Sequence, residues 1–205
     1  DTFQGTTPMG AVDWQVTDTS TLGFTVTRGF KSGGFPTVVD PRLGSNTLDK
    51  PYDSEFTMEY ELTSKNELWD GRLRLNGTAF WTEYDPFQVC QFNGPSYLCN
   101  SNGSATIRGI ELEYILTPME GLQFNGFFNW LDSRINNMQL VDPTIRGCQQ
   151  PGCPSLEQPP ASVPGSILPV DVSGNKLTRS PNWAGSFGVQ YEFDFGRWGF
   201  FTEET

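Results

Sequence analysis

The sequence predicts an all-β fold, an antiparallel up-and-down transmembrane β-barrel to which this chain contributes about eight strands. Apolar and polar residues alternate with a period of two along most of the chain, as they do in strands with two different faces. Short turns alternate with long polar connections, which is typical of outer-membrane barrels. Only 36% of the 205 residues are hydrophobic, and no apolar stretch reaches the roughly 18 residues that a membrane-spanning helix needs.

The first predicted hairpin contains Val12 to Val16, a turn at Asp18-Thr19-Ser20, and a strand from Leu22 through Val26. Arg28 falls in the apolar phase of this second strand. Two explanations remain open at this point. The side chain extends towards polar surroundings, or a β-bulge near Gly29 resets the alternation.

The next hairpin is centred on Asp70-Gly71, a strong signal for a two-residue turn. The strand from Glu55 to Leu68 precedes this turn, and a second strand runs from Arg72 past Trp81. This turn fixes one register, in which apolar residues face apolar ones and polar residues face polar ones. The predicted partners are Leu68 with Leu73, Leu62 with Ala79, Tyr60 with Trp81, Glu67 with Arg74, and Lys65 with Asn76.

The same alternation predicts a third hairpin over 109–116 and 122–130, joined at Pro118-Met119-Glu120. A fourth contains 183–193 and Arg197 to Thr202, joined around Phe195-Gly196. Between the hairpins lie three long connections, at about 31–53, 92–105 and 136–179. All three fall at the same end of the strands, so we expect them to be extracellular loops. Because loops carry ligand contacts more often than scaffolds do, Tyr52, Tyr97 and Arg146 are candidate ligand contacts.

The chemistry of the two faces predicts which one meets lipid. The polar face carries too many carboxylates for a dry core but could line water, so the apolar face is expected to lie against outer-membrane lipid. The candidate residues facing the lumen are Glu59, Glu61, Arg72, Arg74, Glu111 and Glu113. The candidate aromatic residues at the lipid interface are Tyr60, Trp81 and Trp130. A soluble β-sandwich with core tryptophans is the alternative.

Four cysteines occur as two close pairs, Cys90 with Cys99 and Cys148 with Cys153, each within one predicted loop. An even count in an oxidising compartment favours two local disulfides. A thiolate metal site is the alternative, although the pairs lie on different loops and the chain contains no His.

The sequence predicts no catalytic, cofactor-binding or metal-binding residue, and therefore no enzyme. The paired glutamates on alternate strand positions suit a water-lined wall better than acid–base catalysis. The net charge of −11, from 13 basic and 24 acidic residues, argues against nucleic acid as a partner.

Motifs along nearly the whole chain resemble the TonB-dependent receptors of Gram-negative outer membranes. This resemblance implies a barrel of about 22 strands with a plugged lumen. It also implies a bacterial outer-membrane location and an inner-membrane, TonB-type energy transducer that acts through the plug. The motifs are Arg28-Gly29-Phe30-Lys31-Ser32-Gly33-Gly34-Phe35, Tyr60-Glu61-Leu62 with Lys65, Trp69-Asp70-Gly71-Arg72-Leu73-Arg74-Leu75-Asn76, Phe80-Trp81 with Tyr84, Gln88, Ile107-Arg108-Gly109-Ile110-Glu111-Leu112-Glu113, and Lys176-Leu177 with Ser180-Pro181.

The expected domain is therefore a partial barrel over 1–205. The sequence starts at Asp1 without a signal peptide, and we expect the plug domain and the closing strands to lie outside it. The function implied by the resemblance is energised uptake of a scarce nutrient, with an Fe(III)–siderophore as the expected ligand class. A passive outer-membrane porin and a soluble β-sandwich binding module are the alternatives.

Overall fold

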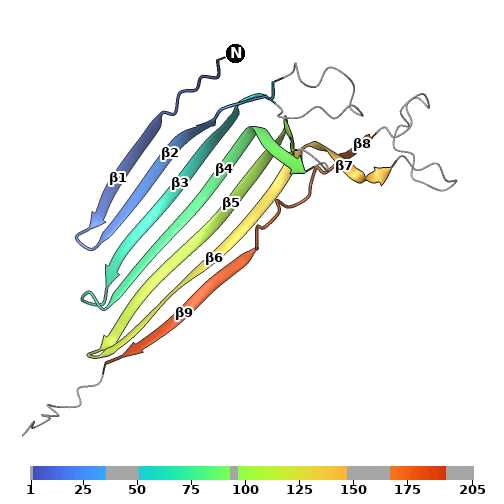
Figure 1. Ribbon diagram of the computed structural model, residues 1–205. Coiled ribbons are helices and arrows are strands. Elements are labelled where there is room, and N and C mark those ends of the chain that lie inside the picture. The colour runs from blue at the N-terminus through green and yellow to red at the C-terminus, as the bar shows by residue number, and fades with distance from the viewer. Residues whose placement is uncertain (1, 36–50, 93–96, 147–166, 193–205) are drawn as a thin grey trace, which may run out of the picture.

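The computed structural model describes residues 2–35, 51–92, 97–146 and 167–192, which form one large antiparallel sheet and one small one (Figure 1). The large sheet has seven strands in the order β1-β2-β3-β4-β5-β6-β9, and β7 pairs with β8 separately. The strands are β1 (Met9–Thr17), β2 (Ser20–Lys31), β3 (Glu55–Leu68), β4 (Leu73–Phe92), β5 (Tyr97–Met119), β6 (Leu122–Asn137), β7 (Gln139–Arg146), β8 (Ile167–Asp171) and β9 (Trp183–Tyr191).

The predicted register of the β3–β4 hairpin is confirmed at all five predicted pairs. Its turn carries a hydrogen bond of 3.2 Å from the Arg72 N–H to the Trp69 carbonyl oxygen. The two central residues have positive φ, 55° at Asp70 and 80° at Gly71. Positive φ at both central residues is what a type I′ turn needs, and Trp69 before them also has a positive φ, of 54°. The local sequence therefore sets the register of the hairpin.

The other two short turns also join neighbouring strands in the large sheet. Thr17 pairs with Ser20 across the first turn, and Met119 pairs with Leu122 across the turn that contains Gly121, whose φ is 80°. In Figure 1 all the short turns lie at one end of the sheet and the long connections leave from the other. The connection between β4 and β5 covers only 93–96, so the predicted alternation of short and long connections holds between β2 and β3 and between β6 and β9 but not there.

The structure corrects the extent of two predicted loops. Residues 97–105 were expected in a loop, but they belong to β5 and pair with the extended end of β4. The segment 136–179 likewise contains β7 and β8. Strand pairing prevails there over a Gly-, Ser- and Pro-rich composition with low intrinsic β-propensity. The predicted strand from Arg197 to Thr202 lies outside the described residues.

Arg28 remains in the apolar phase of β2. The β2–β3 pairing runs without interruption from Ser20 to Lys31, so the proposed bulge near Gly29 is wrong. The Arg28 guanidinium carbon lies 4.5 Å from the centroid of the Phe56 ring. The side chain is therefore accommodated on the apolar face by an aromatic neighbour.

The buried hydrophobic side chains lie at the end of the large sheet from which the long connections leave. Among the described residues the buried hydrophobic side chains are Ala105, Ile135 and Met138. Close packing explains why Gly103 has no side chain, since a Cβ there would lie 2.4 Å from the Met138 Cε. No helix in the described part of the chain is long and apolar enough to span a membrane.

Candidate functional site

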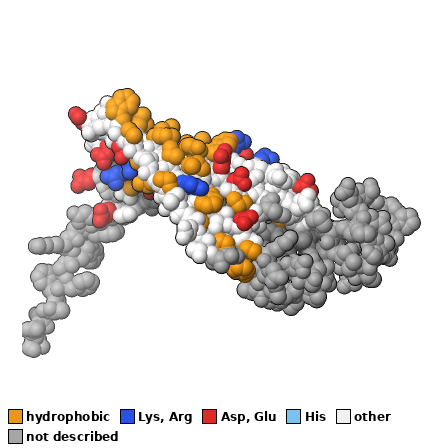
Figure 2. All heavy atoms as spheres, turned by 90° about the horizontal axis from the view of Figure 1, so that it is seen from above, with side chains coloured by type: hydrophobic (Ala, Val, Ile, Leu, Met, Phe, Trp, Pro, Cys, Tyr) orange, Lys and Arg blue, Asp and Glu red, His pale blue; other side chains and the backbone are white. Residues whose placement is uncertain are grey.

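The two faces of the large sheet are chemically opposite. One row of cross-strand partners passes through all seven strands and contains only apolar residues. Many large hydrophobic side chains on this face are exposed, and Figure 2 shows hydrophobic side chains gathered in a band along one side of the sheet. Contiguous exposed apolar surface of this kind marks a contact with a membrane or a protein. The row is Val12, Phe24, Leu62, Ala79, Ile110, Trp130 and Trp183.

The opposite, polar face brings together five of the six predicted lumen residues. Glu59 and Glu61 lie on β3, Arg74 on β4, and Glu111 and Glu113 on β5, all in the phase opposite to the apolar row. Arg74 donates a hydrogen bond of 3.2 Å from Nη2 to Glu67 Oε1, and Asn129 donates one of 3.2 Å to Glu111 Oε1. This arrangement suits a wall that faces water.

Arg72 was predicted to face the lumen, but it lies in the turn between β3 and β4 rather than on a strand of the wall. Its carbonyl oxygen accepts a hydrogen bond of 2.7 Å from the Thr117 N–H, and its Nη1 donates one of 3.4 Å to the Pro118 carbonyl oxygen. Arg72 thus ties the β3–β4 turn to the end of β5.

A buried polar cluster occupies the polar face near the end with the long connections. Glu55 is only 8% exposed, and its Oε2 accepts a hydrogen bond of 2.7 Å from the Gln88 N–H. The Gln88 amide donates to the carbonyl oxygens of Ser32 at 3.0 Å and Asp53 at 2.8 Å. Gln88 therefore holds both ends of the 31–53 connection against β4. The motif resemblance had singled out Gln88, whereas Glu55 is recognisable only from its position at the start of a strand in the polar phase.

The predicted interface aromatics form a band on the apolar face. Tyr60 stands opposite Trp81, and Trp130 stands opposite Trp183 with ring centroids 6.2 Å apart. Trp183 is also part of this band, although it was not among the predicted interface residues. The alternation had marked it as apolar, but only the β6–β9 register places it beside Trp130.

The three predicted ligand contacts lie at the same end of the sheet, but not all in loops. Tyr52 forms an isolated bridge with Gly34, with hydrogen bonds of 2.8 and 3.2 Å between their backbones. Tyr97 is the first residue of β5 and pairs with Phe92, and Arg146 is the last of β7 and pairs with Ile167. The prediction that Tyr97 and Arg146 are loop residues is corrected by these pairings.

Cys90 is disulfide-bonded, and its partner in the β4–β5 register is Cys99. Cys148 and Cys153 lie outside the described residues. At the end of β8, Asp171 Oδ1 accepts a hydrogen bond of 2.9 Å from the Ser173 N–H. Hydrogen bonds from the Ser173 side chain and backbone lower the pKa of the Asp171 carboxyl. This carboxylate stabilises the chain where it turns back towards β9.

Residues 1–204 match the model of a family described as TonB dependent receptor-like, beta-barrel. This chain belongs to the TonB-dependent receptors. The family is one of transport receptors, and its barrels are bacterial outer-membrane proteins. A soluble β-sandwich is thereby excluded as the fold, and the seven-stranded sheet is part of a barrel wall.

Two solved structures share this fold. The ferric yersiniabactin uptake receptor FyuA from Yersinia pestis is 18% identical, with a TM-score of 0.61 over 91% of this chain and 23% of its own. The ferric-catecholate import receptor Fiu from K12 E. coli is 14% identical, with a TM-score of 0.55 over 89% of this chain and 22% of its own. The chain thus spans less than a quarter of either receptor.

Proposed function

We propose that the complete protein containing this chain is a bacterial outer-membrane receptor that imports an Fe(III)–siderophore with energy from an inner-membrane transducer. The observation that carries the proposal is the family match over residues 1–204. The fold is shared with two receptors whose names specify ferric ligands, which supports this ligand class.

The polar face of the barrel wall gives this proposal its physical basis. Carboxylates and amides on the polar face would line water, and a barrel of about 22 strands has a lumen wide enough to need a plug. A filled lumen does not conduct by diffusion, so import requires work on the plug. The transducer would act through a plug domain, which we place outside this chain.

In this arrangement the end with the long connections faces the outside of the cell. The Glu55–Gln88 cluster then holds the 31–53 connection where ligand first arrives. Tyr52, Tyr97 and Arg146 lie at this same end and remain proposed ligand contacts. Glu59, Glu61, Arg74, Glu111 and Glu113 are the proposed residues of the lumen wall.

The test is uptake of radiolabelled Fe(III)–siderophore by cells that express the complete protein, with and without the transducer. We expect uptake to require both the transducer and the proton gradient across the inner membrane. In planar bilayers the purified protein is expected to conduct no steady ion current. Undiminished uptake without the transducer, together with open-channel conductance, would establish a passive porin instead. Energised uptake of cobalamin or a glycan would refute the ligand class alone.

A further inference from the structure

Charged residues interrupt the apolar face within its aromatic band, where Arg108 stands directly opposite Trp81. Arg108 of β5 stands opposite Asp132 of β6, one face position beyond the Ile110–Trp130 pair towards the long connections. Because a strand rises about 3.4 Å per residue, the two pairs are separated by roughly 7 Å along the strands. The next position on β6 is Arg134. Charge at this place is unexpected on a face otherwise suited to lipid.

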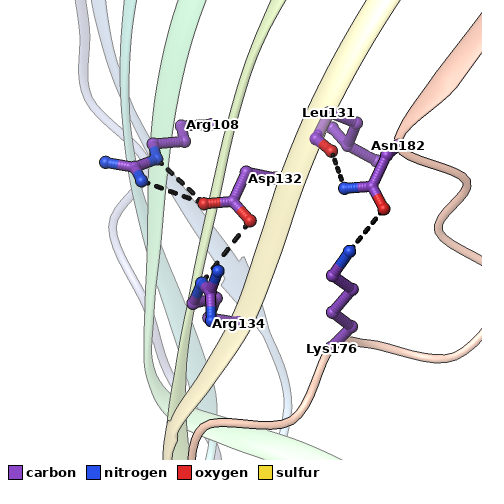
Figure 3. A network of polar contacts seen from close by, with 6 residues as sticks. All are labelled: Arg108, Leu131, Asp132, Arg134, Lys176 and Asn182. Atoms are coloured by element: carbon purple, nitrogen blue, oxygen red, sulfur yellow. Dashed lines mark hydrogen bonds and ion pairs between the residues drawn. The ribbon is translucent and has the colours of Figure 1, made fainter.

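One carboxylate orients both guanidinium groups (Figure 3). Arg108 donates to Asp132 Oδ2 from Nε at 3.2 Å and Nη2 at 2.9 Å. Arg134 Nε lies 3.5 Å from Oδ1 of the same carboxylate. The Asp132 side chain is 11% exposed, whereas those of Arg108 and Arg134 are 46% and 55% exposed. The anion is therefore covered, while both cations remain accessible with further N–H donors.

Trp81 fixes the cluster to the aromatic band. The Arg108 guanidinium carbon lies 5.4 Å from the centroid of the Trp81 ring, within the range of a cation–π contact. The Trp81 Nε1–H donates a hydrogen bond of 3.1 Å to Glu83 Oε1. Arg28 lies in the same cross-strand row as Glu83, with Met58 between them. The charged band therefore consists of three arginines and two carboxylates, namely Arg28, Arg108, Arg134, Glu83 and Asp132. Its net charge is +1, on a chain whose overall charge is −11.

We propose that Arg108 and Arg134, held by Asp132, bind the phosphate of a lipid headgroup in the outer leaflet. The proposal rests on the membrane placement in the proposed function. Aromatic residues of a barrel wall lie at the level of the headgroups. Arg108 beside Trp81, and Arg134 one face position further towards the long connections, therefore meet headgroups rather than acyl chains. Guanidinium forks match the geometry of phosphate oxygens, and the net positive band complements an anionic lipid.

An ion cluster without a ligand explains the arrangement less well. Exposed ion pairs contribute little stability, and a single carboxylate leaves one of two accessible guanidinium groups without charge compensation. A phosphate bound beside Asp132 would supply the missing negative charge and accept the remaining donors. The lipid chains attached to it would then lie along the apolar row next to the band.

The test compares phosphatidic acid with diacylglycerol of the same acyl chains, which lacks only the phosphate. Retention of each lipid by the complete, detergent-solubilised receptor is measured by native mass spectrometry. Wild-type protein is expected to prefer phosphatidic acid by about tenfold or more, since hydrogen bonds between charged groups are strong. The Arg108→Gln/Arg134→Gln variant should lose this preference. The matched control Lys65→Gln/Arg74→Gln removes the same charge from the polar face and should keep it.

A preference that survives in the Arg108→Gln/Arg134→Gln variant, or is lost equally in the control, would overturn the proposal. Competition by millimolar inorganic phosphate would identify a free-anion site and also overturn it. Circular dichroism and resistance to unfolding in detergent verify that each variant is folded. Siderophore uptake is measured separately. A receptor that prefers phosphatidic acid but imports no iron would refute the proposed function alone, whereas one that imports iron without the preference would refute this inference alone.

Discussion

The guanidinium group of Arg28 on β2 stacks over the ring of Phe56 on β3, with 4.5 Å between the guanidinium carbon and the ring centroid. The two residues are diagonal neighbours on the apolar face, since Arg28 pairs with Met58 and Phe30 pairs with Phe56. The negative face of the ring attracts the cation. This contact explains how an arginine occupies the apolar face without disturbing the strand register.

We expect this contact to stabilise the barrel by about 0.5–2 kcal/mol, the range of cation–π interactions. A double-mutant cycle with Arg28→Met and Phe56→Leu in the complete protein measures the coupling free energy of unfolding. The cycle of Arg28→Met with Phe24→Leu is the control, because residues this far apart on one strand behave additively. Equal coupling in both cycles would show that the stacking contributes nothing specific.

The two faces are expected to differ in access to water at adjacent residues of β4. Leu75 lies in the apolar phase, and Asn76 lies opposite Lys65 on the polar face. With the native cysteines changed to Ser, a charged, water-soluble thiol reagent should label Asn76→Cys much faster than Leu75→Cys in the membrane-embedded protein. In denaturant the two rates should converge. Equally fast labelling in the membrane would contradict the placement of the apolar face against lipid.

Each cysteine pair is expected to form a disulfide within its own segment. Cys90 is disulfide-bonded, and Cys99 is its register partner, so non-reducing peptide mapping should return Cys90 linked to Cys99. The same map should return Cys148 linked to Cys153. A linkage between Cys99 and Cys148 would instead join two separate connections.

The turn at Gly71 offers a test of how local sequence sets the register. Its φ of 80° is unfavourable for residues with a Cβ, so Gly71→Ala should lower the free energy of unfolding by about 1–2 kcal/mol. Gly10→Ala is the matched control, because a Cβ at Gly10 would have no atom within 4 Å and its φ is not positive. A similar effect of both substitutions would show that the turn conformation is not the cause.

The sequence predicts the β3–β4 hairpin well because two independent signals agree there. Asp70-Gly71 specifies a tight turn, and both faces then match in chemistry. The pairing of β7 with β8 carries neither signal, because prolines and glycines dominate the connection between them. The Arg108–Asp132 contact was not predicted, since the two residues lie 24 positions apart and only the β5–β6 register brings them together.

The consecutive pairing of β1 to β6 has a consequence for how sequence variation is tolerated. Each of these strands pairs with its neighbours in the chain, and only the step from β6 to β9 passes over other strands. The entropy of closing a loop rises slowly, by about 0.6 kcal/mol for each doubling of length. Insertions in the long connections therefore cost the wall little, whereas the tight turns admit few changes. A lineage of such proteins can alter the surface that meets new ligands while keeping the strand ladder unchanged.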